Sequence, residues 1–210
     1  MIGWTVLIGA VLAAFFQAPP LLLDAAQIGY IYTGAFVGSI LGLILSGLLS
    51  DLMTRMMIKW NKGRYEPEFR ILLVFFQLIF SGAGLYGFGI VTNDVGAYTH
   101  GRIVTSVFLG LVIMGMVMGA VASALYIVDA HRKSRSQPLG GLGRADYPGQ
   151  IAVEAFTCLL IFKNFFSFVI TFYAFDWVTQ SDIRNAFIAI GTVQVAVCLL
   201  SIPMCKISHD

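Results

Sequence analysis

The chain has few charged residues, and this shortage excludes several classes of protein. Only 11% of its 210 residues are Asp, Glu, Lys or Arg, whereas a soluble domain has about 25%. Because 58% of the residues are hydrophobic, the chain cannot cover a folded core with hydrated side chains, so lipid must be its solvent. The composition also excludes intrinsic disorder. A net charge of +2 argues against a polyanionic partner, and no nucleic acid is expected.

Cysteine is also scarce. Cys158, Cys198 and Cys205 are too few for a disulfide-stapled domain and have no metal-ligand spacing, so we expect no metal and no cofactor. Cys158 and Cys198 lie in apolar runs and are expected to be small buried hydrophobic residues. Cys205 lies at a membrane edge, where packing and palmitoylation are the two interpretations.

Long apolar runs dominate the sequence. A bilayer core of about 30 Å needs roughly 20 apolar residues per helix, and five segments meet this: 28–50, 70–92, 102–128, 153–175 and 185–205. A sixth segment, 2–16, is shorter and stops before Pro19 and Pro20. No Lys or Arg precedes it, which favours a helix without its first turns over a signal peptide. We therefore predict an all-α membrane protein, with residues 1–210 forming one domain of six transmembrane helices.

The basic residues predict an orientation. Ten of the 13 Lys and Arg lie in the loop after the second segment, in the loop after the fourth, or in the C-terminal tail. Arg102 and Arg184 lie on the opposite side, and Lys163 lies within a segment. By the positive-inside rule, the two long loops and the C-terminus are cytoplasmic.

Small residues recur at helical spacing in two of the segments. Gly34, Gly38 and Gly42 are four residues apart in the second, and Gly115 and Gly119 are four apart in the fourth. Such a stripe lets another helix backbone approach closely. The spacing predicts a packed bundle, but it does not distinguish static packing from helices that slide or rock against a partner.

Two motifs flank the loop after the second segment. The first, Gly47-Leu-Leu-Ser-Asp51-Leu-Met-Thr-Arg55, places Asp51 and Arg55 on one helix face, where they can pair. The second, Glu66-Pro-Glu68-Phe-Arg70, opens the third segment with a proline and two acidic residues suited to a helix N-terminus. The alternative interpretation is a helix cap with basic anchors, and for Glu66 and Glu68 this alternative can be the whole explanation.

Together, these motifs resemble the C-terminal half of a fungal-type major facilitator superfamily transporter. Further matching runs are Gly29-Tyr30, Gly34-Ala-Phe-Val-Gly38, Tyr126-Ile-Val-Asp129-Ala-His131-Arg132, Lys163-Asn164-Phe165-Phe166 and Ile202-Pro203-Met204. The resemblance covers nearly the whole chain. It implies half of a twelve-helix carrier that binds a small solute between two six-helix halves and works by rocking them. The partners implied are the bilayer, the solute and the missing N-terminal half.

The resemblance also implies a cytoplasmic gating network. Its candidate members are Gly47, Asp51, Arg55, Glu68, Arg70, Asp129 and Arg132. For Asp129, a solvated helix end is an equally good interpretation.

Lys163 is the sharpest single signal within the membrane segments. A charge near mid-bilayer costs about 3 kcal/mol on insertion scales, so Lys163 should face protein or water. It can contact a solute or a coupling group, or it can form a structural pair between helices. Asn164 and Gln17 are the accompanying candidates for substrate or coupling contacts.

Residues 133–149 do not match their surroundings. The stretch is rich in Pro and Gly, and joining Arg132 to Gln150 restores a compact family-like loop. The flanking codons can encode splice sites that remove 17 codons in frame. A retained intron is therefore the leading interpretation, and a tolerated, disordered cytoplasmic loop is the alternative.

Other functions fit less well. An intramembrane enzyme would need a nucleophile and a base at depth, but Ser81-Gly-Ala-Gly84 is not a rhomboid-type Gly-x-Ser-Gly, and all three His lie at membrane edges. No selectivity-filter motif supports a channel. A truncated protein that does not transport is the remaining alternative.

Overall fold

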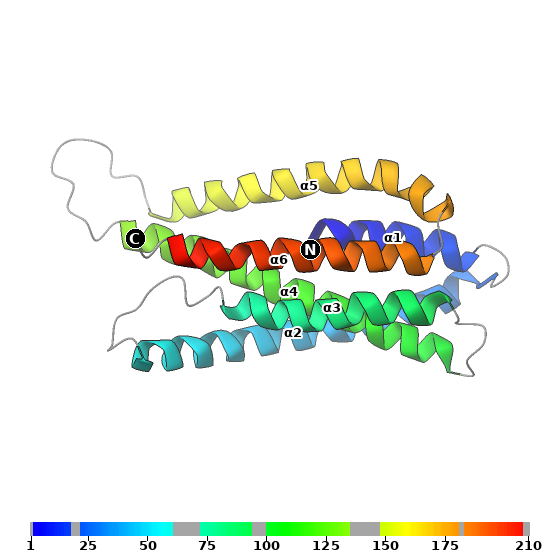
Figure 1. Ribbon diagram of the computed structural model, residues 1–210, viewed down its shortest axis with the longest axis horizontal. Helices are drawn as coiled ribbons and strands as arrows, with labels where there is room; N and C mark the ends of the chain where they lie inside the picture. The colour runs from blue at the N-terminus through cyan, green and yellow to red at the C-terminus, as the bar shows by residue number, and fades with distance from the viewer. Residues whose placement is uncertain are drawn as a thin grey trace.

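The chain folds into a bundle of helices that share one long axis. In the computed structural model, consecutive helices run in opposite directions (Figure 1). Their bounds are α1 Ile2–Gln17, α2 Ala25–Trp60, α3 Leu72–Asn93, α4 Gly101–Ser134, α5 Pro148–Gln180 and α6 Ile183–Ile207. The structure describes residues 2–17, 22–60, 72–93, 100–134, 148–180 and 183–207. The prediction of an all-α fold is confirmed.

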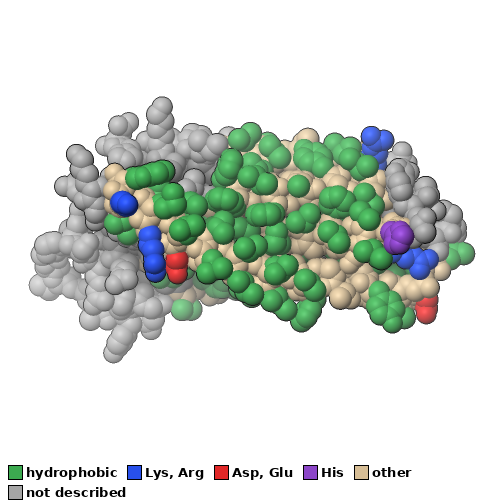
Figure 2. All heavy atoms as spheres, turned by 90° about the horizontal axis from the view of Figure 1, so that it is seen from below, with side chains coloured by type: hydrophobic (Ala, Val, Ile, Leu, Met, Phe, Trp, Pro, Cys, Tyr) green, Lys and Arg blue, Asp and Glu red, His purple; other side chains and the backbone are tan. Residues whose placement is uncertain are grey.

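Four helical stretches are long and apolar enough to cross a membrane: Ala25–Trp60, Leu73–Thr92, Gly101–Val128 and Phe156–Tyr173. The other two helices offer shorter apolar stretches: α1 has 16 residues, and the apolar part of α6 is Arg184–Leu199. Many large apolar side chains point outward, among them Phe36 at 66% and Phe172 at 71% exposure. Figure 2 shows a broad apolar surface with charged side chains confined to its two ends. Four such helices indicate an integral membrane protein.

Several helices extend past the apolar segments that predict them. The segment 28–50 belongs to a helix that continues to Trp60, and the segment 153–175 belongs to one that spans Pro148–Gln180. Hydropathy marks only the part of a helix that suits lipid, whereas the backbone ladder continues through residues such as Met56 and Lys59, which favour helix in water. The predicted segments therefore match the helices in order and number but not in length.

The two ends of the bundle have different helix termini. We call the end where α1 finishes and α2 begins the Gln17 end, and the opposite end, where α2 finishes, the Trp60 end (Figure 1). Helices α3 and α5 also finish at the Gln17 end, whereas α4 and α6 finish at the Trp60 end. Both loops predicted to be cytoplasmic therefore leave the bundle at the Trp60 end.

The apolar core is divided along the bundle. The larger cluster, toward the Gln17 end, includes Phe16 of α1, Ile31 of α2 and Phe88 of α3. There the ring of Phe88 also packs against that of Phe187 on α6, with 4.9 Å between the ring centroids. The smaller cluster, toward the Trp60 end, consists of Leu73, Met118 and Ala122, with partly buried neighbours from α2 and α3. Among the described residues, α1 contributes buried side chains only to the larger cluster.

The short connection between α1 and α2 holds these two helices in place. The Leu23 N–H donates a hydrogen bond to the Phe16 carbonyl (2.9 Å), and the Asp24 carboxylate accepts one from the Ala25 N–H (2.8 Å). Farther along, the Tyr32 hydroxyl donates to the Gly9 carbonyl (3.1 Å). The end of α1 is thus fixed to the first turns of α2.

The predicted insert 133–149 lies partly in helix. Its first two residues belong to α4 and its last two to α5. Residues 135–147 lie outside the described residues. The prediction about its origin stays a prediction.

Candidate functional site

The small residues of α2 form a seam with α4. A Cβ built on Gly34 would meet the carbonyl of Ser106, and one on Gly38 would meet the carbonyl of Gly110. One turn farther, a Cβ on Gly42 would lie 3.0 Å from the carbonyl oxygen of Met114. The two backbones therefore approach closely at three positions on successive turns, as the absence of side chains allows.

A serine joins the same two helices by hydrogen bonds. The Ser106 hydroxyl on α4 donates to the Ile31 carbonyl (2.9 Å) and accepts from the Gly34 N–H (3.1 Å), both on α2. This single side chain therefore fixes the register of α4 against α2. The sequence analysis did not identify Ser106. The available signal was that this serine lies in the same apolar segment as the glycines of α4.

A second seam joins α4 to α3. A Cβ on Gly115 would lie 2.7 Å from the backbone nitrogen of Ser81, and one on Gly119 would meet the side-chain amide of Gln77. The Ser81 side chain is fully buried, and Gln77 is 7% exposed. Helix α4 is thus held on both sides, by α2 along one stripe and by α3 along another. This arrangement makes α2, α3 and α4 the tightly packed part of the bundle.

Lys163 lies within the long apolar stretch of α5. It is seven residues after Phe156 and ten before Tyr173, or about 10 Å and 15 Å along the helix. Its side chain is half-buried, and the following residue, Asn164, is exposed. Among the described residues, Lys163 forms no ion pair, so the sequence prediction of a protein-facing or water-facing cation stays open.

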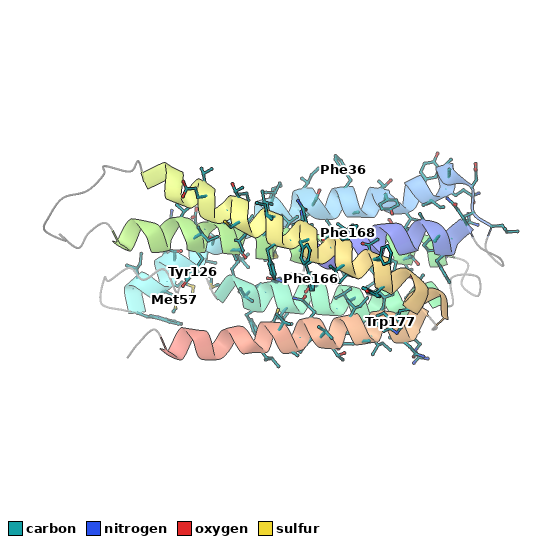
Figure 3. All side chains as sticks on the ribbon, turned by 90° about the horizontal axis from the view of Figure 1, so that it is seen from above. Phe36, Met57, Tyr126, Phe166, Phe168 and Trp177 are labelled. Atoms are coloured by element: carbon teal, nitrogen blue, oxygen red, sulfur yellow. The ribbon has the colours of Figure 1, made fainter. Side chains whose placement is uncertain are left out.

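The surroundings of Lys163 are sharply divided. Ser167, one turn along the same face, is buried, and its hydroxyl has no hydrogen-bond partner among the described residues. The contact face of α5 packs against α1 and α4. On the outward side, Phe168 is 68% exposed, and Figure 3 labels it and Phe166 on the same stretch of α5. Lys163 therefore lies at the margin between a packed face and an exposed aromatic one.

The other two substrate or coupling candidates are differently placed. Asn164 is adjacent to Lys163, whereas Gln17 is the last residue of α1 and lies exposed at the Gln17 end. The structure therefore does not gather the three candidates into one site within this chain.

The gating candidates that the structure describes lie toward the Trp60 end. Asp51 and Arg55 are both exposed on the last turns of α2, and no ion pair joins them in the part of the chain that the structure describes. Gly47 is exposed too, and nothing lies within 4 Å of a Cβ built on it. Asp129 and Arg132 lie in the last turns of α4, but their side chains are outside the described residues, as are Glu68 and Arg70 entirely.

No metal centre is formed by the side chains that the structure describes, since no three His, Cys, Asp or Glu gather among them. The described fold is a helical bundle whose four long apolar helices indicate an integral membrane protein. Its described charged side chains are a lysine inside one helix and others toward the ends of the bundle.

Comparison with known proteins gives a distant relative. The chain is 26% identical over 151 residues to Protein HOL1 of Saccharomyces cerevisiae, a match that covers 70% of this chain. It spans only 22% of the length of HOL1. No protein-family model matches the chain. No solved structure matches it either.

Proposed function

We propose that the chain is the C-terminal six-helix part of a secondary transporter of the major facilitator type, which carries a small solute by alternating access. The distant similarity to HOL1 and the ordered series of motifs from Gly29 to Met204 support this proposal. The activity is transport without chemical change of the solute, so the chain is not proposed to be an enzyme. The Trp60 end, with its basic loops, faces the cytoplasm.

The uneven burial of the helices is the observation that carries the proposal. Among the four long apolar stretches, that of α5 is the least buried and that of α2 is next. Helix α3, by contrast, packs against both α4 and α6. The resemblance places the third and sixth spans at the periphery of a carrier, which leaves α2 and α5 to meet the N-terminal half.

This arrangement gives roles to the exposed polar groups. Asp51 and Arg55 are exposed and form no ion pair among the described residues, so their partners in a gating network are expected on the other half. Lys163 and Asn164, at the edge of the exposed face of α5, contact the solute or a coupling group. A half-buried cation in an apolar helix requires such a partner or water.

The first experiment compares two proteins in liposomes. The complete protein, encoded by the reading frame that includes the DNA upstream of Met1, is compared with residues 1–210 alone. Uptake of radiolabelled amino acids, sugars and organic cations is measured for each. We expect uptake of at least one solute by the complete protein only. Uptake by residues 1–210 alone, or an upstream frame that encodes no further spans, would contradict the proposal and favour a protein that does not transport.

A second experiment tests where the other half docks. Gly47→Trp introduces a large side chain at a position where nothing lies within 4 Å of a Cβ, so a partner packed against α2 there would be displaced. Val197→Trp on α6, at a position 56% exposed, is the matched control on the periphery. In the complete protein we expect the first variant to lose transport and the second to keep it. Equal transport by both variants would exclude docking at this part of α2.

A further inference from the structure

A groove opens between α2 and α4 near the Gln17 end of the bundle. Its volume is about 500 Å³. The two helices cross (Figure 1) and are held in register by Ser106. Val37 and Ile103 contribute apolar walls, and Gln27, Tyr30, Thr33 and Arg102 supply polar groups. None of the last four belongs to the gating or solute candidates, so the groove is a separate feature from those candidates.

The groove combines an apolar wall with a cation that has no ion-pair partner among the described residues. Its lining is mainly apolar. Arg102 is exposed and forms no ion pair within the described ranges. Asp24, an acidic residue whose side chain the structure describes at this end, caps α2 through the Ala25 N–H and does not line the groove. The guanidinium is therefore available for an anion, and it can hold a phosphate by two parallel hydrogen bonds.

The position of the groove along the bundle indicates which kind of anion it binds. It lies at the end of the long apolar helices, where a membrane-embedded bundle meets the headgroup layer. An arginine at that level, beside an apolar channel between two helices, matches a molecule with a phosphate at one end and a hydrocarbon chain at the other. The Thr33 hydroxyl and the Gln27 amide can bond the ester and glycerol oxygens.

We propose that this groove binds a glycerophospholipid, with the phosphate on Arg102 and the start of an acyl chain along Val37 and Ile103. The proposal requires only that the bundle is embedded in a membrane and is independent of transport. A bound lipid would lie along the outer side of the α2–α4 contact, over Gly34 and Ser106.

The test uses residues 1–210 in detergent, with phosphatidylglycerol added as the probe and bound lipid counted by native mass spectrometry. Arg102→Gln should weaken binding about fivefold, the effect of one basic residue near a lipid phosphate. Arg184→Gln is the matched control, because Arg184 is also exposed at the Gln17 end but lies on α6, outside the groove. It should leave binding unchanged. Thr33→Phe, which fills the groove, should also weaken binding.

Two further probes separate the alternatives. A diacylglycerol with the same acyl chains lacks the phosphate and should not bind appreciably. Inorganic phosphate at millimolar concentration should not displace the lipid, because it lacks the chain. If Arg102→Gln and Arg184→Gln lose lipid binding equally, the attraction is non-specific. If diacylglycerol binds as well as the phospholipid, the site is simply apolar. If inorganic phosphate displaces the lipid, the site binds free anions. Each of these would overturn the proposal.

Circular dichroism melting shows whether each variant is folded. Because Arg102 and Thr33 are exposed, we expect the melting midpoints of their variants to be unchanged.

Discussion

Gly38 of α2 and Gly110 of α4 meet backbone to backbone, because a Cβ built on Gly38 would collide with the carbonyl of Gly110. The contact is central to the seam that continues to Gly34 and Gly42 on the same helix. Between membrane helices, close packing replaces the hydrophobic effect as the attraction, since lipid tails are as apolar as the side chains. The glycine pair is thus a direct source of stability for the bundle.

A methyl group at this contact should therefore be costly. We expect Gly38→Ala to lower the free energy of unfolding by about 1–3 kcal/mol, since neither backbone can move aside without breaking the seam. Gly47→Ala is the control, because its Cβ would have nothing within 4 Å and alanine favours a helix by up to about 1 kcal/mol over glycine. Unfolding by SDS titration, followed by circular dichroism, measures both. Equal SDS unfolding midpoints for Gly38→Ala and Gly47→Ala would contradict a stabilising contact between α2 and α4 at Gly38.

Ser106 should contribute to the same interface through its hydroxyl. Ser106→Ala removes the bonds to the Ile31 carbonyl and from the Gly34 N–H, and we expect a loss of about 1 kcal/mol, the usual range for hydrogen bonds between membrane helices. Ser123→Ala is matched, because the Ser123 hydroxyl bonds only the Gly119 carbonyl of its own helix (2.8 Å). The same SDS titration should show a shift for Ser106→Ala alone. A similar shift for Ser123→Ala would assign the effect to the helix rather than to the interface.

The seams show how far the sequence can predict this fold. The four-residue spacing of Gly34, Gly38 and Gly42 indicates a close helix contact, but it cannot say that the partner is α4. Ser106 could not be identified in advance, because its importance depends on which carbonyl faces it after the helices cross. Likewise, Asp51 and Arg55 have the spacing of an ion pair, yet both are exposed without one in the described part of the chain. On a solvated helix end, side-chain entropy opposes such a pair.

The predicted orientation can be tested at the two ends of the bundle. Lys59 and Arg184 are exposed at the Trp60 end and the Gln17 end, respectively. In a background in which Cys158, Cys198 and Cys205 are replaced by alanine, Lys59→Cys and Arg184→Cys are labelled with a membrane-impermeant maleimide in sealed right-side-out vesicles. We expect labelling of Arg184→Cys only, because the basic loops stay on the cytoplasmic side. Inside-out vesicles should give the reverse pattern. If each vesicle preparation labels the other cysteine instead, the orientation is the reverse of the predicted one.

Lys163 should matter for transport through its charge. In the complete protein, we expect Lys163→Met to lose most transport while Lys163→Arg keeps a substantial part, because methionine preserves the stem but not the cation. Uptake is normalised to protein in the membrane, so that a loss of folding is separated from a loss of activity. Wild-type uptake per molecule by Lys163→Met would make Lys163 a structural residue of the α5 contact face.

The last prediction is that residues 133–149 are absent from the mature transcript. Three features support it: the Pro- and Gly-rich composition, splice-site codons that remove 17 codons in frame, and the family-like junction of Arg132 with Gln150. The bundle sets a further condition, because α4 runs to Ser134 and α5 begins at Pro148. Removing the segment takes away the whole connection, so residues at the two helix ends must unwind to form the turn, for which about 2–8 residues suffice.

Sequencing of cDNA across codons 128 to 155 tests this directly. We expect reads that lack the 51 nucleotides of the 17 codons. The protein without residues 133–149 should then unfold at the same SDS concentration as the longer chain, because the seams of α4 with α2 and α3 lie far from this loop. A transcript pool in which every read keeps the segment would end the intron hypothesis. In that case an unchanged SDS midpoint for the shortened protein would identify the segment as a tolerated loop, since the α4 seams would hold without it.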